Sequence, residues 1–378
     1  MVAVVRRWLS QLLRRNVATQ VYPPPQHSRW QVVFPRGGTD WTQWVGDPWT
    51  CGVVGSGVYW VARSMLEAPI RYQVGEEWED HPILQRFERP NELYGWDSLV
   101  VGTALSLLVD GNAYWLDTGT EWYYLPHVGL EVRVDQGRLE YAIRVGNGQT
   151  MTLPPEMVVH FRYGLNPRNP WLGYSPLQGV LREIATENEA ATYSAVLLKN
   201  FGVPTIVIVP RDDQYSITPD EASQLEERVR QRFSGERRGS PLIPEIPVDV
   251  KQVGFSPEQL VLDKVRSVPA ARICSALGLD PIVIGLPSEN KTFSNYSEAR
   301  ESAYEMTVVP LQRLIVGTLN HVYREELEPG RLVFDLSKVR VLQGDVDRRL
   351  SVLSDLVKSG VLTPEDVRPI VRKLLGEE

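Results

Sequence analysis

The stretch 279–323 decides how this chain is organised, and it reads LDPIVIGLPSENKTFSNYSEARESAYEMTVVPLQRLIVGTLNHVY. A short apolar helix that leads into the stretch ends at Asp280-Pro281. A polar loop without a regular hydrophobic period follows over residues 287–293. A helical pattern then begins, with Ser294 or Asn295 as its N-cap. A helix, a polar loop and a second helix in this order indicate a mechanical part, because the stretch carries no catalytic signature.

The helix after this loop is long for a compact domain. Its apolar period covers residues 295–326, whereas an average helix has about 11 to 12 residues. Pro310 lies in its middle, lacks a backbone N–H and therefore removes one helical hydrogen bond. We predict a kink at Pro310.

Composition places the chain among ordinary core-forming proteins. It has 378 residues, of which 43% are hydrophobic and 23% are charged. This length suits two or three compact domains or one elongated subunit. A net charge of -7 and a pI near 5.5 argue against a protein that coats nucleic acid through a basic surface. The acidic net charge is compatible with a protein that lets nucleic acid slide past it.

The cysteines and histidines indicate neither a disulfide framework nor a metal site. Cys51 and Cys274 lie far apart in apolar surroundings, so we expect buried thiols. The five histidines share no ligand spacing with one another or with the cysteines. We therefore predict no metal and no cofactor.

Residues 1–40 read as a separate N-terminal arm. VAVVRRWLSQLLRR (2–15) is a short basic amphipathic helix, and its arginines interrupt the apolar run that a signal peptide requires. Such a helix suits a membrane surface or nucleic acid, but we favour an arm that docks on a protein partner or is partly disordered. The Pro-rich piece 22–26 then separates the arm from the body. No run of 18 or more apolar residues is present to span a membrane.

The first half of the chain has α+β character. The pattern predicts a helix over 52–65, a strand after Pro69, a helical turn over 81–91, an apolar helix over 96–108, and short strands over 113–162 with turns at 136–137 and 146–148.

Two helices in the middle of the chain bracket a small module. Residues 175–201 form one helix capped by Ser175, and residues 256–277 form the other with Pro269 inside it. The first carries a stripe that packs either into a core or against a neighbouring subunit, namely Leu177, Val180, Leu181, Ile184, Ala191, Ala195 and Leu198.

Between these helices lie a strand over 205–209, a helix over 218–233 and one or two strands over 243–255. Thr218 and Glu221 form a capping box at the start of the middle helix. After the long helix we predict a strand over 331–338 and two amphipathic helices over 345–375, separated by Ser359-Gly360.

Catalytic motifs are missing from the sequence. It contains no phosphate-binding GxxxxGK[ST], no GxSxG elbow and no HExxH. Eight of the eleven tryptophans fall in the first hundred residues, which raises a carbohydrate-active enzyme as one alternative, although no pair of acids across a cleft is evident. The basic N-terminal helix raises a membrane-surface adaptor as another. We predict that the chain is not an enzyme.

Several segments, in register, resemble the portal proteins of long-tailed double-stranded DNA bacteriophages. They are SGVYWVARSMLEAPIRY (56–72), HPILQRFERPNELYGWDSLV (81–100), LVDGNAYWL (108–116), LPPEMVVHFRYG (153–164) with GYSPL (173–177), FGVPTIVIV (201–209), and LGLDPIVIGL with TFSNYSEA (277–299). Together they span roughly residues 50 to 325.

The resemblance implies an α+β portal-type subunit whose parts can be laid on this chain. They are the N-terminal arm (1–40), the wing (41–173 with 327–341), two stem helices (175–202 and 256–279), a small α/β clip (203–255), the tunnel loop region (280–297), the long kinked helix (298–326) and a short helical crown (342–378).

The resemblance also implies a function. Such proteins form a homo-oligomeric ring, usually a dodecamer, at one capsid vertex, and double-stranded DNA passes through its axis during packaging and ejection. The implied partners are the terminase packaging motor, the head-completion or tail adaptor protein and the major capsid protein. The resemblance implies no contact with a membrane. The implied location is the virion, and the host cytoplasm during assembly.

The resemblance assigns the loop that projects into the DNA channel to Ser288, Glu289, Asn290, Lys291, Thr292, Phe293, Ser294 and Asn295. Lys291 is the only cation among them, so we predict weak polar contacts with DNA rather than sequence readout. Pro310 is expected to set the angle of the helix that carries this loop.

Overall fold

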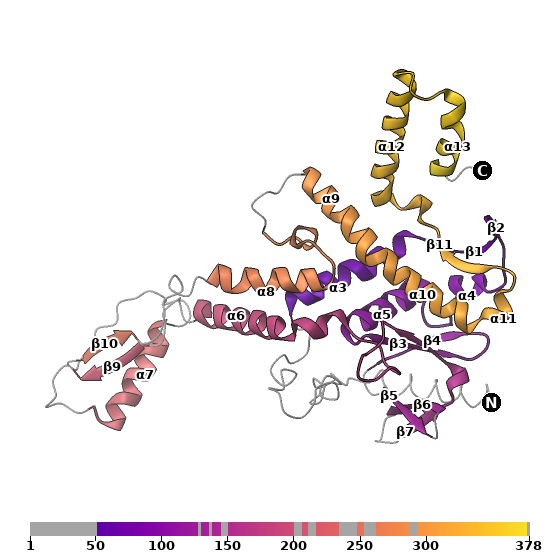
Figure 1. The fold of residues 1–378 in the computed structure, drawn as a ribbon. Helices are drawn as coiled ribbons and strands as arrows, with labels where there is room; N and C mark the ends of the chain where they lie inside the picture. The colour runs from indigo at the N-terminus through magenta and orange to yellow at the C-terminus, as the bar shows by residue number, and fades with distance from the viewer. Residues whose placement is uncertain are drawn as a thin grey trace. The chain divides into compact units, whose positions relative to one another are not determined.

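The computed structural model describes residues 51–127, 130–135, 138–144, 150–199, 206–210, 217–233, 248–252, 262–287 and 293–375. Helices alternate with small antiparallel sheets along the chain (Figure 1). The chain divides into two compact units, Met1–Leu181 with Ala271–Glu378 and Arg182–Ala270. The predicted arm, the predicted turns at 136–137 and 146–148, and loop residues 288–292 lie outside the described residues.

The N-terminal part of the first unit has the predicted order of helices and short strands. Its elements are α3 Gly52–Ser64, β1 Ile70–Val74, β2 Glu77–Glu79, α4 Leu84–Glu88, α5 Trp96–Val109, β3 Asn112–Asp117, β4 Trp122–Leu125, β5 Leu130–Asp135, β6 Arg138–Arg144, β7 Thr150–Leu153 and β8 Val158–Arg162.

Strand β3 is the centre of the main core. It pairs with β4 and with β8, and β5, β6 and β7 form a second antiparallel sheet. Tyr114 and Leu116 of β3 pack in one apolar cluster with Tyr141 and Ile143 of that second sheet. Trp115 is also fully buried, and its indole Nε1 donates to Thr103 Oγ1 of α5 at 2.7 Å. Because successive strand residues point to opposite faces, β3 is buried on both sides.

Aromatic rings fill the side of β3 that faces α5. Trp115 lies 5.4 Å from Trp122 and 4.6 Å from Phe161, measured between ring centroids, and Phe87 lies 4.9 Å from Trp96. We call these five residues the aromatic core. The tryptophans of this group therefore stabilise the fold, as expected for large apolar side chains that have a polar N–H to satisfy.

The C-terminal part of the first unit is mainly helical. Its elements are the end of α8 (Leu262–Ala276), a 3-10 turn at Pro281–Ile284, α9 Phe293–Ala303, a π-helical turn at Tyr304–Val308, α10 Val309–Val322, α11 Arg324–Leu327, β11 Arg331–Phe334, α12 Arg340–Lys358 and α13 Pro364–Leu375.

Strand β11 joins the two ends of this unit. It pairs antiparallel with β1 in a sheet of order β11-β1-β2, with Tyr72 opposite Leu332. The Tyr72 hydroxyl donates to Leu327 O at 2.8 Å and accepts from Gly330 N at 3.0 Å. A side chain at Gly330 would lie 2.5 Å from the Tyr72 ring, so only glycine fits there.

The strand predicted over 331–338 is too long. It ends at Phe334, and a 3-10 turn follows at Leu336–Lys338. Asp335 causes the break, because its Oδ1 accepts from Ser337 N at 3.0 Å and its Oδ2 lies 3.3 Å from Arg71 Nε. A short acidic side chain that bonds its own backbone two residues on favours a turn over a strand.

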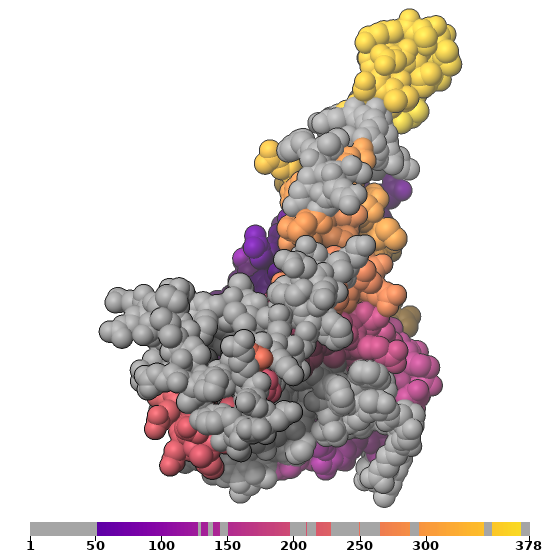
Figure 2. All heavy atoms as spheres, turned by 90° about the vertical axis from the view of Figure 1, so that its left-hand side faces the viewer, coloured from indigo at the N-terminus to yellow at the C-terminus, as the bar shows by residue number. Residues whose placement is uncertain are grey.

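The two predicted C-terminal helices are present, but the first begins at Arg340 rather than at residue 345. The chain turns at Ser359-Gly360 as predicted, with Gly360 at φ 75°, and Thr363 caps α13 through Asp366. Val352, Val361 and Ile370 remain exposed, and the yellow hairpin is open to solvent in the space-filling view (Figure 2). Two amphipathic helices alone do not bury both of their apolar faces.

The second unit contains most of α6 (Leu181–Lys199), β9 Ile206–Pro210, α7 Pro219–Phe233, β10 Val248–Gln252 and the start of α8. β9 and β10 pair antiparallel. The predicted capping box is confirmed, since Thr218 N donates to Glu221 Oε2 at 2.9 Å. Ser175 caps as predicted, but a 3-10 turn at Pro176–Val180 comes first and the α-helix begins at Leu181.

Both cysteines are free and buried, as predicted. Burial raises the pKa of the Cys274 thiol to about 11. Within the part of the chain that the structure describes, no helix is long and apolar enough to cross a membrane.

Candidate functional site

The candidate site is the frame on either side of loop residues 288–292. On the N-terminal side, α8 ends at Ala276, close to the predicted end near residue 277, and a separate 3-10 turn begins after Asp280. Asp280 Oδ1 accepts from Ile282 N at 2.9 Å, and Gly285 ends the turn with φ 82°. Ile282 and Val283 are buried, so the turn is packed into the body before the loop begins.

A hydroxyl group fixes the end of α8 to the long helix. Thr307 Oγ1 lies 3.0 Å from Leu277 O and 3.1 Å from Gly278 O, and it donates to this pair of carbonyls. Gly278 has φ 69°, and a Cβ there would lie 2.3 Å from Thr307 Oγ1. Glycine is therefore required by both the backbone conformation and the close approach of Thr307.

On the C-terminal side the helix starts earlier than predicted. Phe293, Ser294 and Asn295 already form the first turn of α9, so neither Ser294 nor Asn295 is the N-cap. An ion pair joins α9 to the end of α3, with Arg300 Nη2 2.9 Å from Glu67 Oε1. Both side chains are partly exposed, so this pair contributes less than about 1 kcal/mol and serves mainly to orient α9.

The irregularity in the long helix lies just before Pro310. Residues Tyr304–Val308 form a π-helical turn, and Pro310 stands in the first turn of α10, where a missing N–H costs little. Figure 1 draws α9 and α10 one after the other along one helix. Tyr304 is fully buried within this turn, accepts a hydrogen bond from Gln312 Nε2 at 3.3 Å, and has its pKa raised to about 12 by burial.

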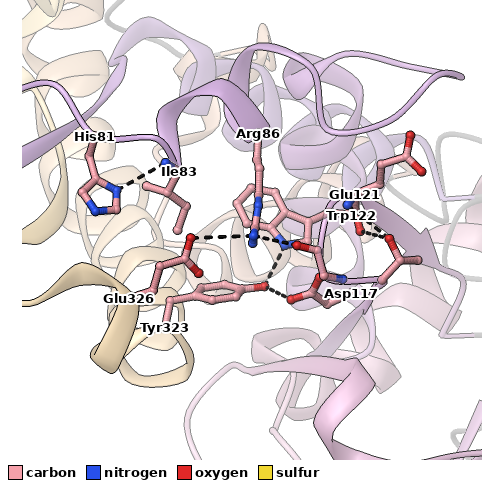
Figure 3. A network of polar contacts seen from close by, with 10 residues as sticks. His81, Ile83, Arg86, Asp117, Glu121, Trp122, Tyr323 and Glu326 are labelled. Atoms are coloured by element: carbon pink, nitrogen blue, oxygen red, sulfur yellow. Dashed lines mark hydrogen bonds and ion pairs between the residues drawn. The ribbon is translucent and has the colours of Figure 1, made fainter. Parts of the chain in front are cut away.

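The far end of this helix is tied to the aromatic core (Figure 3). The Tyr323 hydroxyl donates to Asp117 Oδ2 at 2.7 Å and accepts from Trp122 Nε1 at 2.7 Å. Burial, followed by the negative charge of Asp117, raises the pKa of Tyr323. Arg86 lies over the Trp122 ring, donates to Gly119 O at 2.7 Å, and its Nη2 is 3.7 Å from a carboxylate oxygen of Glu326 in α11.

A second tie holds α10 to β11. Asn320 Nδ2 donates to Leu332 O at 2.9 Å, and Asn320 Oδ1 accepts from Leu332 N at 2.7 Å. The helix that leaves the loop is therefore held at its start by Arg300, in its middle by Thr307 and at its end by Tyr323 and Asn320. Such a rigid frame suits a part that positions a loop.

In the second unit, α6 and α8 run side by side (Figure 1) and are joined by an ion pair. We call these two helices the stem pair. Glu187 is 5% exposed, and its Oε1 lies 2.8 Å from Arg266 Nη2. The first part of the predicted stripe is buried at Ile184, but Ala195 is exposed, and so are Tyr193 and Val196 beside it.

On α8 the apolar side chains of Val265 and Val268 are also exposed, at 38% and 51%. The stem pair thus leaves apolar surface uncovered within one chain. Exposed apolar residues on long helices are typical of a face that packs against another subunit.

Three contacts, two in the loop frame and one in the stem pair, could not be found by sequence reasoning. They are the Tyr323–Asp117 bond, the Arg266–Glu187 pair and the Thr307 bond to Gly278. Each joins residues far apart in the chain, and no local motif marks them. Among the described residues, no three His, Cys, Asp or Glu side chains cluster as a metal site would require.

Comparison with known proteins places this frame in a family. A family model described as "Phage portal protein" matches residues 53–371. A chain in a structure described as "Neck of empty GTA particle computed with C6 symmetry" has a TM-score of 0.65 and 25% identity, covering 90% of this chain and 95% of that one.

Two further structures share the fold. A chain of the "Neck of native GTA particle computed with C12 symmetry" has a TM-score of 0.63 and 23% identity, over 98% of this chain and 99% of that one. An HK97 family phage portal protein from Corynebacterium diphtheriae has a TM-score of 0.56 and 16% identity, over 76% and 93%.

Small antiparallel sheets joined to long helices, as found here, are the fold of portal-type subunits. The match over most of its length shows that the chain belongs to the phage portal protein family. That family carries a portal ring function and consists of structural proteins. The alternatives of a carbohydrate-active enzyme and a membrane-surface adaptor find no support, and three of the tryptophans lie in the aromatic core.

Proposed function

We propose that this chain is the subunit of a ring at one vertex of a phage-like capsid, and that double-stranded DNA passes through the ring during packaging and ejection. The family match over residues 53–371 carries the proposal. The likeness to a chain from the neck of a GTA particle, over 90% of this chain, supports it independently. An acidic channel protein lets DNA move without a tight grip on its phosphates.

The parts are assigned as the sequence predicted. The wing takes residues 41–173 with 327–341, which agrees with the pairing of β1 and β11. The stem helices and the clip at 203–255 agree with the separate compact unit Arg182–Ala270. The crown takes residues 342–378, which agrees with the pair of helices α12 and α13. The tunnel loop takes residues 288–292 and the first turn of α9, and Pro310 with the π-helical turn sets its angle.

The ring would be a closed head-to-tail assembly of identical subunits, and we propose twelve of them. In such a ring each subunit presents two different surfaces to its neighbours. The exposed apolar residues of the stem pair, Tyr193, Val196, Val265 and Val268, provide one of these surfaces. The likeness to a neck chain in a structure with C12 symmetry supports this number.

The proposed partners follow from this place in the particle. They are the terminase packaging motor and an adaptor protein at the clip, and the major capsid protein around the wing. The proposed location is the virion, and the host cytoplasm during assembly.

The ring is tested by mass photometry and negative-stain microscopy of the purified chain. Twelve copies of the 42.8 kDa chain weigh about 510 kDa, and each particle should show a central hole. Val196→Asp with Val268→Asp should shift the mass to that of the single chain. Val134→Asp, an exposed valine on β5, is the matched control and should leave the ring intact. If rings still form with the double substitution, the stem pair is not part of the interface between subunits.

The loop assignment has its own test. Asn290→Ala with Lys291→Ala should leave the ring mass unchanged and alter the amount of DNA packaged per particle, because the loop contacts DNA and not the neighbouring subunit. Loss of the ring in this variant would contradict the placement of the loop in the channel.

A further inference from the structure

Two exposed surfaces of the first unit carry opposite charge. The first is the end of the β1–β2 hairpin at residues 75–80, which we call the acidic tip, because it contains four acidic residues and no basic one. The second joins β8 to the turn before α6 at residues 162–174, and we call it the basic loop, because it contains two arginines and no acidic residue. Each surface also exposes a tryptophan, Trp78 at 44% and Trp171 at 41%. The stem pair and the loop frame account for neither surface.

Hydrogen bonds hold the basic loop in one shape. Asn166 is 5% exposed, its backbone N–H donates to Leu172 O at 2.9 Å, and its Oδ1 accepts from Arg168 N at 2.9 Å. Arg162 Nε donates to Trp171 O at 2.9 Å. A loop that is already ordered loses little conformational entropy when a partner binds to it.

This ordered loop presents apolar side chains to solvent. Leu165 is 66% exposed and Tyr174 is 37% exposed, in addition to Trp171, and Arg168 is exposed among them. Tryptophan, tyrosine and arginine are the residues that most often supply the binding energy of protein interfaces. A rigid loop that displays all three is typical of a surface on which a protein docks.

The acidic tip lies on the outer strand of its sheet, because β2 is the last strand in the order β11-β1-β2. Glu77 and Glu79 point to one face of this sheet and Trp78 points to the other. A partner that packs across the edge of β2 therefore meets all three side chains. The edge of a sheet also leaves backbone groups without a partner strand, so it is a natural place for another chain to approach.

The charge of the acidic tip is not balanced by a described neighbour. Arg71 lies over the Trp78 ring, with its Cζ 5.4 Å from the ring centroid, but its Nε is 3.3 Å from Asp335 Oδ2. Within the described residues, none of the four carboxylates of the tip forms an ion pair. A partner with arginines would supply the missing positive charge.

These charges decide between two ways in which copies of the chain could meet. Two acidic tips would repel each other, and so would two basic loops, which disfavours a two-fold contact through either surface. A tip that faces a loop brings opposite charges and two tryptophans together. This contact joins two different surfaces, as a head-to-tail assembly requires.

We propose that the acidic tip of one subunit docks on the basic loop of the next subunit in the ring. Glu77 and Glu79 lie near Arg168 in this contact, and Trp78 packs against Trp171. The inference rests on the proposed ring and adds a second contact to the one made by the stem pair. Its opposite charges also fix the direction in which successive subunits join.

The contact is tested by exchanging its charges. Arg168→Glu should raise several-fold the chain concentration at which half of the chains are in rings, as measured by mass photometry. Glu77→Lys with Glu79→Lys should have the same effect, and the three substitutions together should restore most of the ring formation. The effect of each reversal should shrink as NaCl is raised, because salt screens exposed charges.

Matched controls reverse exposed charges outside both surfaces. Arg89→Glu is the control for the loop, and Glu88→Lys with Glu92→Lys is the control for the tip. Neither should change ring formation. Far-UV circular dichroism verifies that the variants are folded, and rescue by the opposite reversal separates a lost contact from a misfolded loop.

A crosslink between two differently labelled chains locates the contact. Chains with Glu76→Cys are mixed with chains with Leu165→Cys before assembly and then treated with a short bismaleimide. A crosslinked pair should form in the mixture, whereas neither variant alone should react, since both native cysteines are buried. Val134→Cys in place of Leu165→Cys is the matched control and should give no product, because Val134 lies on β5 and is 46% exposed.

The possible failures of this contact and of the ring can be told apart. Rings that form normally in both charge-reversal variants and give no crosslink in the mixture would overturn the docking of tip on loop and leave the ring standing. Crosslinks in the Glu76→Cys chains alone would assign the tip to a like-with-like contact and would also overturn it. An unmodified chain that forms no ring would overturn both the docking and the proposed function.

Discussion

The aromatic core of the first unit and the stem pair of the second unit differ in how they bury apolar surface. The core surrounds a strand whose two faces are both covered, and the Trp115 indole has its hydrogen bond within the same chain. The stem pair has one ion pair between its helices and leaves Val196 and Val268 about half exposed. The first region buries its apolar surface within a single chain, whereas the second leaves part of it exposed, and in the proposed ring a neighbouring subunit would cover it.

This difference corresponds to two roles that we propose for the subunit, namely supporting the loop and assembling the ring. The core supports the helix α9–α10, which carries the loop that we propose lies in the channel, so it must keep its shape in each copy. The stem pair is proposed to join copies, so its apolar residues must stay available until the ring closes. Single substitutions should therefore affect either folding of the chain or assembly of the ring.

The largest effect is expected in the aromatic core. Trp115→Ala removes a fully buried ring and leaves Thr103 Oγ1 without its donor, so the free energy of unfolding should fall by about 3–5 kcal/mol. Val196→Ala in the stem pair should change it by less than about 0.5 kcal/mol. Urea unfolding of both variants measures the difference. Comparable losses at the two sites would show that the stem helices are already part of the core of a single chain.

The next effect concerns alkaline pH. The pKa of Tyr304 is about 12 in the folded chain, against a usual value of 10.0, so the folded state holds this proton more tightly. The resulting stabilisation is complete below pH 10 and is lost as the pH rises to about 12, on the order of 2 kcal/mol. Urea midpoints measured from pH 8 to 12 should fall over this window, and Tyr304→Phe should flatten the fall. Tyr174→Phe, at a partly exposed tyrosine, should not.

The tie between the long helix and the core is expected to have an effect of similar or smaller size. Tyr323→Phe leaves Asp117 Oδ2 and Trp122 Nε1 without their shared hydroxyl, which should reduce the free energy of unfolding by about 1–3 kcal/mol. Amide hydrogen exchange should increase at α10. An unchanged exchange rate there would mean that Asn320 alone holds the end of the helix.

The smallest effect is expected at the ion pair of the stem. Glu187→Gln removes the charge from a buried carboxylate, while its partner Arg266 is 48% exposed and can regain water, so the cost should be about 1 kcal/mol. Glu189→Gln, at an exposed position two residues on, is the control. Hydrogen exchange at α6, measured in single chains and in rings, should show the loss mainly in single chains. A larger loss in rings would place Glu187 at the contact between subunits.

Local sequence signals predicted much of this fold. Thr218 with Glu221, and Ser175, identified helix starts, because a cap acts on the backbone two or three residues away. Short alternating segments identified the strands. Errors fell at element ends, such as Asp335, where a side chain bonds a turn instead of continuing the strand.

The candidate site was predicted less completely. The family resemblance predicted the place of the loop, which stays a prediction, and Pro310 predicted an irregular helix, which is present at the π-helical turn before it. The π-helical turn was missed, because the bond of Thr307 to the end of α8 joins residues about 30 positions apart. The buried Glu187 was also missed, since its partner lies 79 residues away.

The sequence by itself determined the order of elements, the polar character of the segment after Pro287 and the resemblance to the phage portal protein family. Caps, prolines and apolar periods act over a few residues, so they can be recognised in the sequence. Only the tertiary structure decided which side chains hold the loop frame. Tyr323 meets Asp117 from 206 residues away, and the aromatic rings around β3 come from several separate elements. The physical reason is that burial and hydrogen bonding depend on neighbours in space, and a linear pattern does not specify them.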